Sequence, residues 1–321
     1  MRTILLLIYW LVAAGVADFA FAQSAPPEIT LKNLNRPCGI AFRPGGTADR
    51  FEVFIAETGA GRIVRWSTDA PGKAVDVIQG FAVGGDFTRF EPTGPVALWF
   101  LDPGMLVVGT TASRTAATVR SYELPEQDTT IEAEDDHSHA GGNRAAAAAC
   151  LSITRSRANE FVTDALLLAL RDASGGRLMK ARIQAGIVGN MRPFLETAAE
   201  ADPRALATSP AGRIVVADDQ GRLSFYNPID GDVELRLTTE LKQIAGLAYS
   251  PTTSSLYAVD FSQGLFRLDD ASEPGRPACK AVQIAAMREA SALAFAPDGS
   301  LYLVTFGDGT NGTLQVLSGN L

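Results

Sequence analysis

Histidine, cysteine and lysine are scarce in this chain, and their scarcity excludes several kinds of chemistry. Only two histidines are present, His137 and His139, and both lie in one segment, 132–142. The chain has no G-x-S-x-G nucleophile elbow, no glycine-rich phosphate loop and no H-E-x-x-H metalloprotease motif. The sequence therefore lacks a complete catalytic motif of these common enzyme classes.

The three cysteines, Cys38, Cys150 and Cys279, do not have the spacing of a metal site. Zinc sites typically pair cysteines as C-x-x-C, and no such pair is present. Cys38 and Cys150 fall at equivalent places in two non-adjacent repeats, which predicts a separation too large for a disulfide. We therefore expect three free thiols that behave as small buried apolar residues.

The charge of the chain disfavours two classes of partner. The formal net charge is −8, and only five of the 28 basic residues are lysine. A chain this acidic has no electrostatic reason to bind nucleic acid or an anionic membrane. Its composition, rich in alanine and arginine, is typical of a bacterial protein encoded by a GC-rich genome.

The first residues predict export. Arg2 is followed by an apolar run over 4–17 and by the small-x-small cleavage pattern Ala20-Phe21-Ala22. An uncleaved membrane anchor is the alternative, but the run is short for a bilayer and Asp18 interrupts it. We expect a signal peptide over 1–22 and one domain over 23–321, secreted or periplasmic and monomeric.

A short phrase recurs along the chain. It reads Ile40-Ala41-Phe42-Arg43-Pro44 and returns at 206–210, 247–251 and 293–297. The last three prolines are 41 and 46 residues apart, a period typical of one four-stranded propeller blade. Two degenerate copies, at 95–109 and 149–167, bring the number of units to six. A solenoid or two stacked sheets are the alternatives, and a solenoid would need capped ends.

Each unit has the same internal pattern. An apolar strand ends at a proline-containing turn, and a second strand rich in β-branched and aromatic residues follows, such as FEVFIAE or SLYAVDF. A glycine-containing turn leads to a third strand and then to a weaker outer one. The segment 166–171 has some helical character, but the neighbouring repeats favour a strand there.

The last unit lacks an outer strand. It stops after TLQVL at 313–317, whereas Pro27–Leu34 stands alone before the first unit and alternates like a strand. We expect Pro27–Leu34 to complete the last blade, which would join the two ends of the domain and remove an open sheet edge. The fold class predicted is all-β, a six-bladed propeller of four-stranded antiparallel blades.

The chain resembles the NHL-type six-bladed propellers over nearly all of residues 23–321. The best match is the phrase P-x-G-I-A-F-x-P-G-G followed by F-I-A-E-T-G-A-G-R-I-V-R-W, between Pro37 and Trp66. Related superfamilies on this fold include TolB-like propellers, gluconolactonase-like lactonases and quinone-dependent sugar dehydrogenases. The resemblance indicates the architecture, and it does not choose among these functions.

Four polar residues stand just before the predicted innermost strands, at the expected channel mouth. They are Arg36, Asp202, Gln243 and Glu289. Such a group could hold a divalent cation, calcium or zinc, or a sugar acid, with Asp202 and Glu289 as the metal ligands. The lactonase resemblance implies a metal at this mouth, but Arg36 replaces the family's first-blade glutamate and no matching asparagine is found. A solvated polar channel end is the alternative.

Two other groups of polar residues have a structural interpretation beside a functional one. Glu57, Asp164, Asp218 and Asp260 are expected to end the second strands and to accept backbone N–H groups of the following loops. Asp135, Asp136, His137 and His139 lie between blades two and three, on the mouth face, where they could bind a transition metal. A charge-rich loop in solvent is the alternative for this second group.

These observations favour a secreted binding or scaffold module for an unknown protein, small-molecule or carbohydrate ligand. The alternative is a metal-dependent lactonase or related hydrolase, in which a metal at the mouth polarises an ester carbonyl. A quinone-dependent sugar dehydrogenase needs a histidine base in the propeller body, and the predicted blades contain no histidine.

Overall fold

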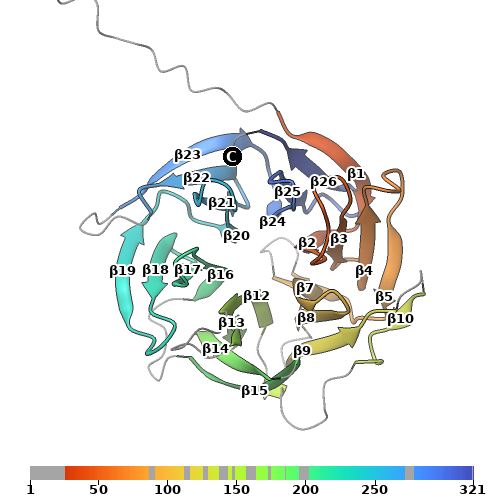
Figure 1. Cartoon of the computed structure of the whole chain (residues 1–321), viewed down its shortest axis with the longest axis horizontal. Helices are drawn as coiled ribbons and strands as arrows, with labels where there is room; N and C mark the ends of the chain where they lie inside the picture. Colours follow the sequence, from red (N-terminus) through yellow and green to blue (C-terminus); the bar gives the residue numbers. More distant parts are fainter. Residues whose placement is uncertain are drawn as a thin grey trace, which may run out of the picture.

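The computed structural model describes residues 26–86, 91–111, 116–125, 129–136, 144–146, 149–156, 164–172, 175–184, 186–194, 202–271, 278–319 and 321. The signal peptide predicted over 1–22 lies outside these residues, as do His137 and His139. The described strands form six sheets arranged as blades around one axis, so the predicted six-bladed propeller is confirmed (Figure 1).

The first three blades follow the chain order, with two additions. Blade 1 contains β2 (Pro37–Phe42), β3 (Glu52–Glu57), β4 (Arg62–Ser67) and β5 (Val75–Gln79), with β10 (Ile131–Glu132) added in parallel at its outer edge. Blade 2 contains β7 (Glu91–Asp102), β8 (Met105–Thr111), β9 (Ala116–Glu123) and β11 (Arg144–Ala146), with β6 (Gly84–Asp86) beside β7. Blade 3 contains β12 (Ala149–Ser156), β13 (Ala165–Asp172), β14 (Gly175–Gln184) and β15 (Ile187–Pro193).

The last three blades have four strands each. Blade 4 contains β16 (Pro203–Thr208), β17 (Ile214–Asp218), β18 (Arg222–Tyr226) and β19 (Val233–Thr238). Blade 5 contains β20 (Ile244–Tyr249), β21 (Leu256–Asp260), β22 (Gly264–Asp269) and β23 (Lys280–Ala286). Blade 6 contains β24 (Ala290–Phe295), β25 (Leu301–Thr305), β26 (Gly312–Leu317) and β1 (Glu28–Leu34). The segment of ambiguous character, 166–171, is a strand as expected.

The predicted closure of the ring is confirmed. β1 pairs antiparallel with β26, from Glu28 opposite Val316 to Leu34 opposite Gly312. Near the axis, the Ser291 hydroxyl donates a hydrogen bond to the carbonyl of Pro37, at 2.6 Å, and so links blade 6 to blade 1. The outer strand of the last blade therefore comes from the start of the described chain.

All six innermost strands contain the same irregularity. In blade 1, the pairing of the innermost strand with the second strand skips one residue directly after Pro37. The same shift in register occurs once in every blade, at 37/39, 95/97, 150/152, 203/205, 244/246 and 290/292. This shared β-bulge aligns the blades residue by residue. It places Cys150 level with Pro37, so our expectation that Cys150 is equivalent to Cys38 is wrong by one residue.

A small residue follows the bulge in every blade. The six residues are Gly39, Ala97, Ser152, Ala205, Gly246 and Ala292. Each innermost strand contacts the next one around the ring, so backbones approach closely at this level. A methyl group on Gly39 would lie 2.5 Å from the carbonyl oxygen of Val96 in blade 2. The small side chains permit this approach.

The blades pack face to face through their second strands. β17, β21 and β25 are buried along their whole length, which explains why they are apolar on both faces rather than alternating. Aromatic rings join blade 6 to blade 1, where Phe51 and Tyr302 meet edge to face with their centroids 5.8 Å apart. The core is thus a series of apolar layers between successive blades.

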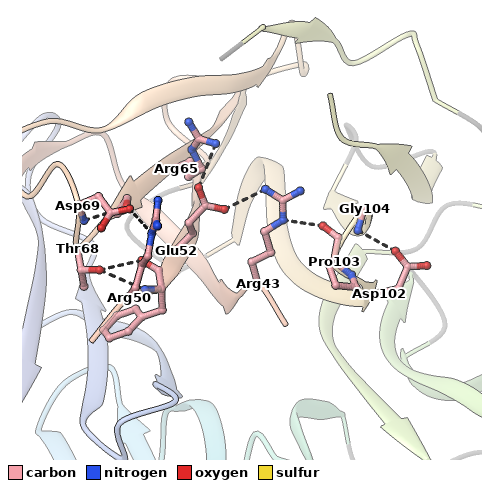
Figure 2. A network of polar contacts seen from close by, with 11 residues as sticks. Arg43, Arg50, Glu52, Arg65, Thr68, Asp69, Asp102, Pro103 and Gly104 are labelled. Atoms are coloured by element: carbon pink, nitrogen blue, oxygen red, sulfur yellow. Dashed lines mark hydrogen bonds and ion pairs between the residues drawn. The ribbon is translucent and has the colours of Figure 1, made fainter. Parts of the chain in front are cut away.

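Arginines connect neighbouring blades at the end where the innermost strands finish. Arg43 donates from Nε to the carbonyl of Pro103, at 2.6 Å, and from Nη1 to Glu52, at 2.9 Å (Figure 2). Arg155 of blade 3 donates from Nη1 to the carbonyl of Leu101, at 2.9 Å. Blade 2 is therefore held by an arginine from each of its neighbours.

Closure predicts unequal effects of two changes in β1. Leu34 is buried and Ile29 is exposed on the same strand, so we expect Leu34→Ala to lower the free energy of unfolding by about 2–5 kcal/mol and Ile29→Ala by less than about 0.5 kcal/mol. Urea denaturation measures both. Equal effects would contradict the closure, and deleting residues 23–34 should lower the melting temperature more than either.

The close approach at Gly39 predicts a second asymmetry. We expect Gly39→Ala to lower the free energy of unfolding by about 1–3 kcal/mol, because the carbonyl of Val96 cannot move away without disturbing β7. Gly72 is the matched control, since an added methyl group there meets no atom within 4 Å. Thermal unfolding of both variants provides the measurement, and a stable Gly39→Ala variant would show that the ring tolerates a wider spacing.

Candidate functional site

The four residues predicted at the mouth occupy equivalent places in the fold. Arg36, Asp202, Gln243 and Glu289 each stand immediately before the innermost strand of blades 1, 4, 5 and 6. The innermost strands of all blades start at the same end of the ring, which we call the mouth end. The equivalence is thus confirmed, whereas a single site formed by these four side chains stays a prediction.

Two of the four residues have an unusual backbone conformation. Arg36 has a φ of 49° and Glu289 a φ of 61°. Gly94 occupies the same position in blade 2, with a φ of 148°. Glycine adopts positive φ without strain, whereas a residue with a long side chain does so at a cost of about 1–3 kcal/mol. Blades 1 and 6 are neighbours, so both strained residues lie at the junction where the ring closes.

In blades 4, 5 and 6, the residue after the second strand binds the backbone of the mouth residue in the same blade. Asp219, Phe261 and Phe306 donate their backbone N–H groups to the carbonyls of Asp202, Gln243 and Glu289, at 3.1, 2.9 and 2.7 Å. Together with the residues at the same level in the other three blades, two of which lie within strands, they form a second ring of positions at the mouth end. Its members are Thr58, Thr111, Arg171, Asp219, Phe261 and Phe306.

The second ring contains an ion-pair partner that the sequence interpretation missed. Arg171 of β13 forms an ion pair with Asp202 across the junction of blades 3 and 4, with Nε 3.1 Å from Oδ2. The Asp202 side chain is only 17% exposed. Its carboxylate is thus largely engaged with a guanidinium. The repeat alignment of the degenerate third blade was too loose to bring Arg171 to this end.

The second ring is aromatic over blades 5 and 6. The rings of Phe261 and Phe306 meet edge to face with their centroids 5.8 Å apart. Phe306 is buried and belongs to the same apolar cluster as Cys38 and Val96 of blades 1 and 2. The sequence signal for this pair was an aromatic residue that directly follows the second strand in two successive repeats.

The acids that end the second strands have the structural role expected of them. Asp260 accepts the backbone N–H groups of Lys242 and Gln243 on one oxygen and those of Ser262 and Gln263 on the other, at 2.9–3.1 Å. Burial acts to raise the pKa of Asp260, but the hydrogen bonds from Ser262 and the backbone outweigh it and hold the pKa below its usual range.

Asp218 acts in a similar way, whereas the backbone donor to Glu57 precedes β2 instead of following β3. Glu57 accepts the backbone N–H of Asn35 and the side chain of Arg62, and Asp218 accepts the backbone N–H groups of Gln220 and Arg222. Asp164 is a correction, because it precedes β13 instead of ending it and pairs with Arg155, at 2.7 Å. The residue level with Glu57 in blade 3 is Leu170.

The acidic loop is not where the sequence placed it. Its described part follows β10, which pairs with β5 at the outer edge of blade 1. This described part comes between β9 and β11 in the chain, before the last strand of blade 2, and so does not lie between blades 2 and 3. Asp135 accepts the backbone N–H of Glu132, at 3.0 Å, and Asp136 lies 3.9 Å from Arg120. Asp135 and Asp136 are therefore at the outer edge of blade 1, on the side of the mouth end but at the rim and not above the axis.

The three thiols are buried and unpaired. Burial raises the pKa of Cys38 and Cys150 to about 12 and that of Cys279 to about 11. A thiol that stays protonated at neutral pH is a poor nucleophile and a poor metal ligand. The interpretation of the cysteines as apolar core residues agrees with these positions.

The described residues offer no further candidate for a metal site or a membrane-spanning segment. Among them, no group of three or more histidine, cysteine, aspartate or glutamate side chains is arranged to hold a metal ion. The described residues form no helix long and apolar enough to cross a membrane.

Comparison with known proteins shows the fold alone. No family model matches the chain, and no curated protein matches it. It is similar to a putative oxidoreductase (glucose dehydrogenase) from Thermus thermophilus, with a TM-score of 0.61 and 16% identity over 91% of this chain and 99% of that one.

Two other solved structures are similar over most of their length. A catalytically inactive virginiamycin B lyase from Staphylococcus aureus with quinupristin has a TM-score of 0.54 and 11% identity, over 91% of this chain and 98% of that one. The WD40 propeller domain of Doa1 has a TM-score of 0.55 and 10% identity, over 92% and 97%. At these identities the likeness extends to the propeller architecture and not to residues of a site.

The hydrogen bonds of Asp260 predict a pH-dependent contribution to stability. We expect Asp260→Asn to lower the free energy of unfolding by about 1–3 kcal/mol at neutral pH, because an amide N–H₂ then faces backbone donors. A carboxyl group with a lowered pKa stabilises the fold above about pH 4, and this stabilisation is lost as the pH falls through the pKa of the folded state. The free energies of unfolding of the variant and the parent should therefore converge in acid.

Urea denaturation at neutral and acidic pH tests this expectation. Asp49→Asn is the control, since Asp49 is exposed in a turn. A difference between Asp260→Asn and the parent that persists unchanged at the lowest pH would show that the carboxylate charge is not what stabilises the loop.

Proposed function

We propose that the protein is an exported propeller of the NHL type that binds a polar ligand at its mouth end. The observation that carries this proposal is the strained backbone of Arg36 and Glu289, at the position where blade 2 uses glycine. Strain of this kind persists where the side chain has a use that a glycine could not serve. Export through a signal peptide over 1–22, to the periplasm or beyond, belongs to the same proposal.

The chemistry of the mouth end favours a ligand that carries both hydroxyl groups and a negative charge. Arg36 supplies a planar guanidinium with several donors, and Gln243 and Glu289 supply an amide and a carboxylate that pair with hydroxyl groups. The aromatic pair of Phe261 and Phe306 borders these residues on blades 5 and 6. A sugar acid matches this set of groups.

The metal-dependent lactonase remains the second candidate, because Asp202 and Glu289 bring two carboxylates to the mouth end. The contacts of both residues support ligand binding better. Asp202 already pairs with Arg171, and Glu289 stands on the blade next to Arg36, whose fixed positive charge opposes a cation. A divalent ion would have to displace a guanidinium to use the Asp202 carboxylate.

Replacing Arg36 tests the proposal. We expect D-galacturonate to raise the melting temperature of the parent protein, because a ligand that binds only the folded state stabilises it. Arg36→Gly should lose this shift, while its own free energy of unfolding should be unchanged or raised by up to about 1 kcal/mol as the backbone strain is relieved. Differential scanning fluorimetry and urea denaturation give the two quantities.

Ser254→Gly is the matched control. Ser254 also has a positive φ, of 58°, but it lies in the turn between β20 and β21, at the opposite end of the ring. It should relieve strain and keep the galacturonate shift. Loss of the shift in both variants, or in neither, would count against a site at Arg36. A calcium-induced shift that disappears in Asp202→Asn with Glu289→Gln would instead favour the lactonase.

A further inference from the structure

The outer strands of blade 3 present positive charge toward blade 4. Met179 and Ile183 of β14 pack toward blade 2, so the alternating residues Lys180 and Arg182 face the other way. Lys180 donates from Nζ to the carbonyl of Pro228 in blade 4, at 3.3 Å, which confirms this direction. Arg192 of β15 stands directly opposite Lys180 and shares its face.

Blade 4 adds a fourth positive charge from the facing side. Leu235 and Leu237 of β19 pack toward blade 5, so Arg236 between them faces blade 3, opposite Ser224. We call Lys180, Arg182, Arg192 and Arg236 the cationic strip. Blades 3 and 4 are neighbours in the ring, and β14, β15, β18 and β19 form their outer parts (Figure 1).

The blade 3 part of the strip is not balanced by acids of its own strands. Residues 173–195 contain four basic residues and no acidic one, in a chain whose net charge is −8. Nearby on blade 4, Glu234 pairs with Arg213, and the Asp230 carboxylate accepts the backbone N–H of Asp232 within the β18–β19 turn. Positive charge is therefore in excess on the outer strands of blade 3.

The contacts of the fold account for Lys180 but not for the second positive charge opposite it. Like charges directly opposite each other on paired strands are destabilising, and Lys180 and Arg192 are such a pair. Lys180 is also half-buried, with Nζ 5.7 Å from the centre of the Phe194 ring, and burial lowers the pKa of its ammonium group. A neutral side chain at 192 would remove the repulsion from Lys180.

Exposed apolar residues accompany the charges. The described residues include five large hydrophobic side chains that are exposed, and three of them lie here: Ile187, Ile229 and Val233. Ile187 stands opposite Gln184 and so shares the face of Arg182, and Val233 stands opposite Tyr226 on the face toward blade 3. Arginine next to exposed apolar surface is typical of protein interaction sites.

We propose that the cationic strip binds an acidic segment of another protein that also carries apolar side chains. The positive charges of Arg182 and Arg192 match the carboxylates of such a segment, and Ile187, Ile229 and Val233 match its apolar residues. A nucleic acid or polyphosphate would use the charges but leave the apolar residues exposed. The strip is at the rim, so its occupant is distinct from a ligand at the mouth end.

Peptide binding to the protein of residues 23–321 tests the proposal. The probe is a short fluorescein-labelled peptide in which glutamate alternates with valine, followed by fluorescence anisotropy. We expect Arg182→Glu with Arg192→Glu to weaken binding at least about tenfold, since two attractive pairs become repulsive. Ile187→Ser with Ile229→Ser should also weaken it. Lys73→Glu, an exposed cation of blade 1, should not.

Stability measurements separate a binding role from a structural one. Arg192→Gln should raise the melting temperature, because a like-charge pair is removed, and should weaken peptide binding at the same time. The proposal is overturned if the double reversal leaves the affinity unchanged in a protein that melts as the parent does. It is also overturned if polyglutamate or polyphosphate binds as tightly as the mixed peptide, which would show that charge alone is recognised.

Discussion

The close approach of six innermost strands around one axis is the constraint on which the rest of the structure depends. At the level just past the shared bulge, the side chains are Gly39, Ala97, Ser152, Ala205, Gly246 and Ala292, and none is larger than serine. Their backbones can therefore approach closely enough for neighbouring blades to share apolar layers. A ring of this kind leaves an unpaired strand edge unless its last blade is completed. β1 completes that blade by pairing with β26.

The geometry of the mouth end follows from the same constraint. The bulge sets the start of each innermost strand, and the loop after the second strand fixes the residue before it through a backbone hydrogen bond, as Phe306 does for Glu289. The acids of the second strands then hold these loops, as Asp260 holds Ser262 and Gln263. The backbone of the mouth residues is thus fixed by hydrogen bonds between main-chain groups. Because the side chains of these residues take no part in those bonds, the residue type can vary between blades.

The sequence predicted the architecture well because the information is repeated. The four clear copies of the [IL]-A-x-x-P phrase set the strand order, and the unpaired Pro27–Leu34 segment indicated the closure. The prediction of the site was weaker wherever a blade departs from the pattern. Asp164 was aligned to the wrong end of its strand because residues 157–163 lengthen the connection before β13, and Arg171 was missed for the same reason. The third unit also lacks the [IL]-A-x-x-P phrase, so its apolar run was aligned one residue out, which explains the error at Cys150.

The positions of the charges separate two kinds of surface in this fold. Near the axis, acids such as Asp260 and Asp202 bind backbone N–H groups or arginines of the fold. At the rim, the constraint of close approach no longer applies, because the blades diverge and long side chains have room. The added strand β10 uses that freedom on blade 1, and the facing cations of blades 3 and 4 use it differently. A propeller can therefore acquire rim surfaces independently of its mouth, since changes at the outer strands leave the contacts of the innermost strands untouched.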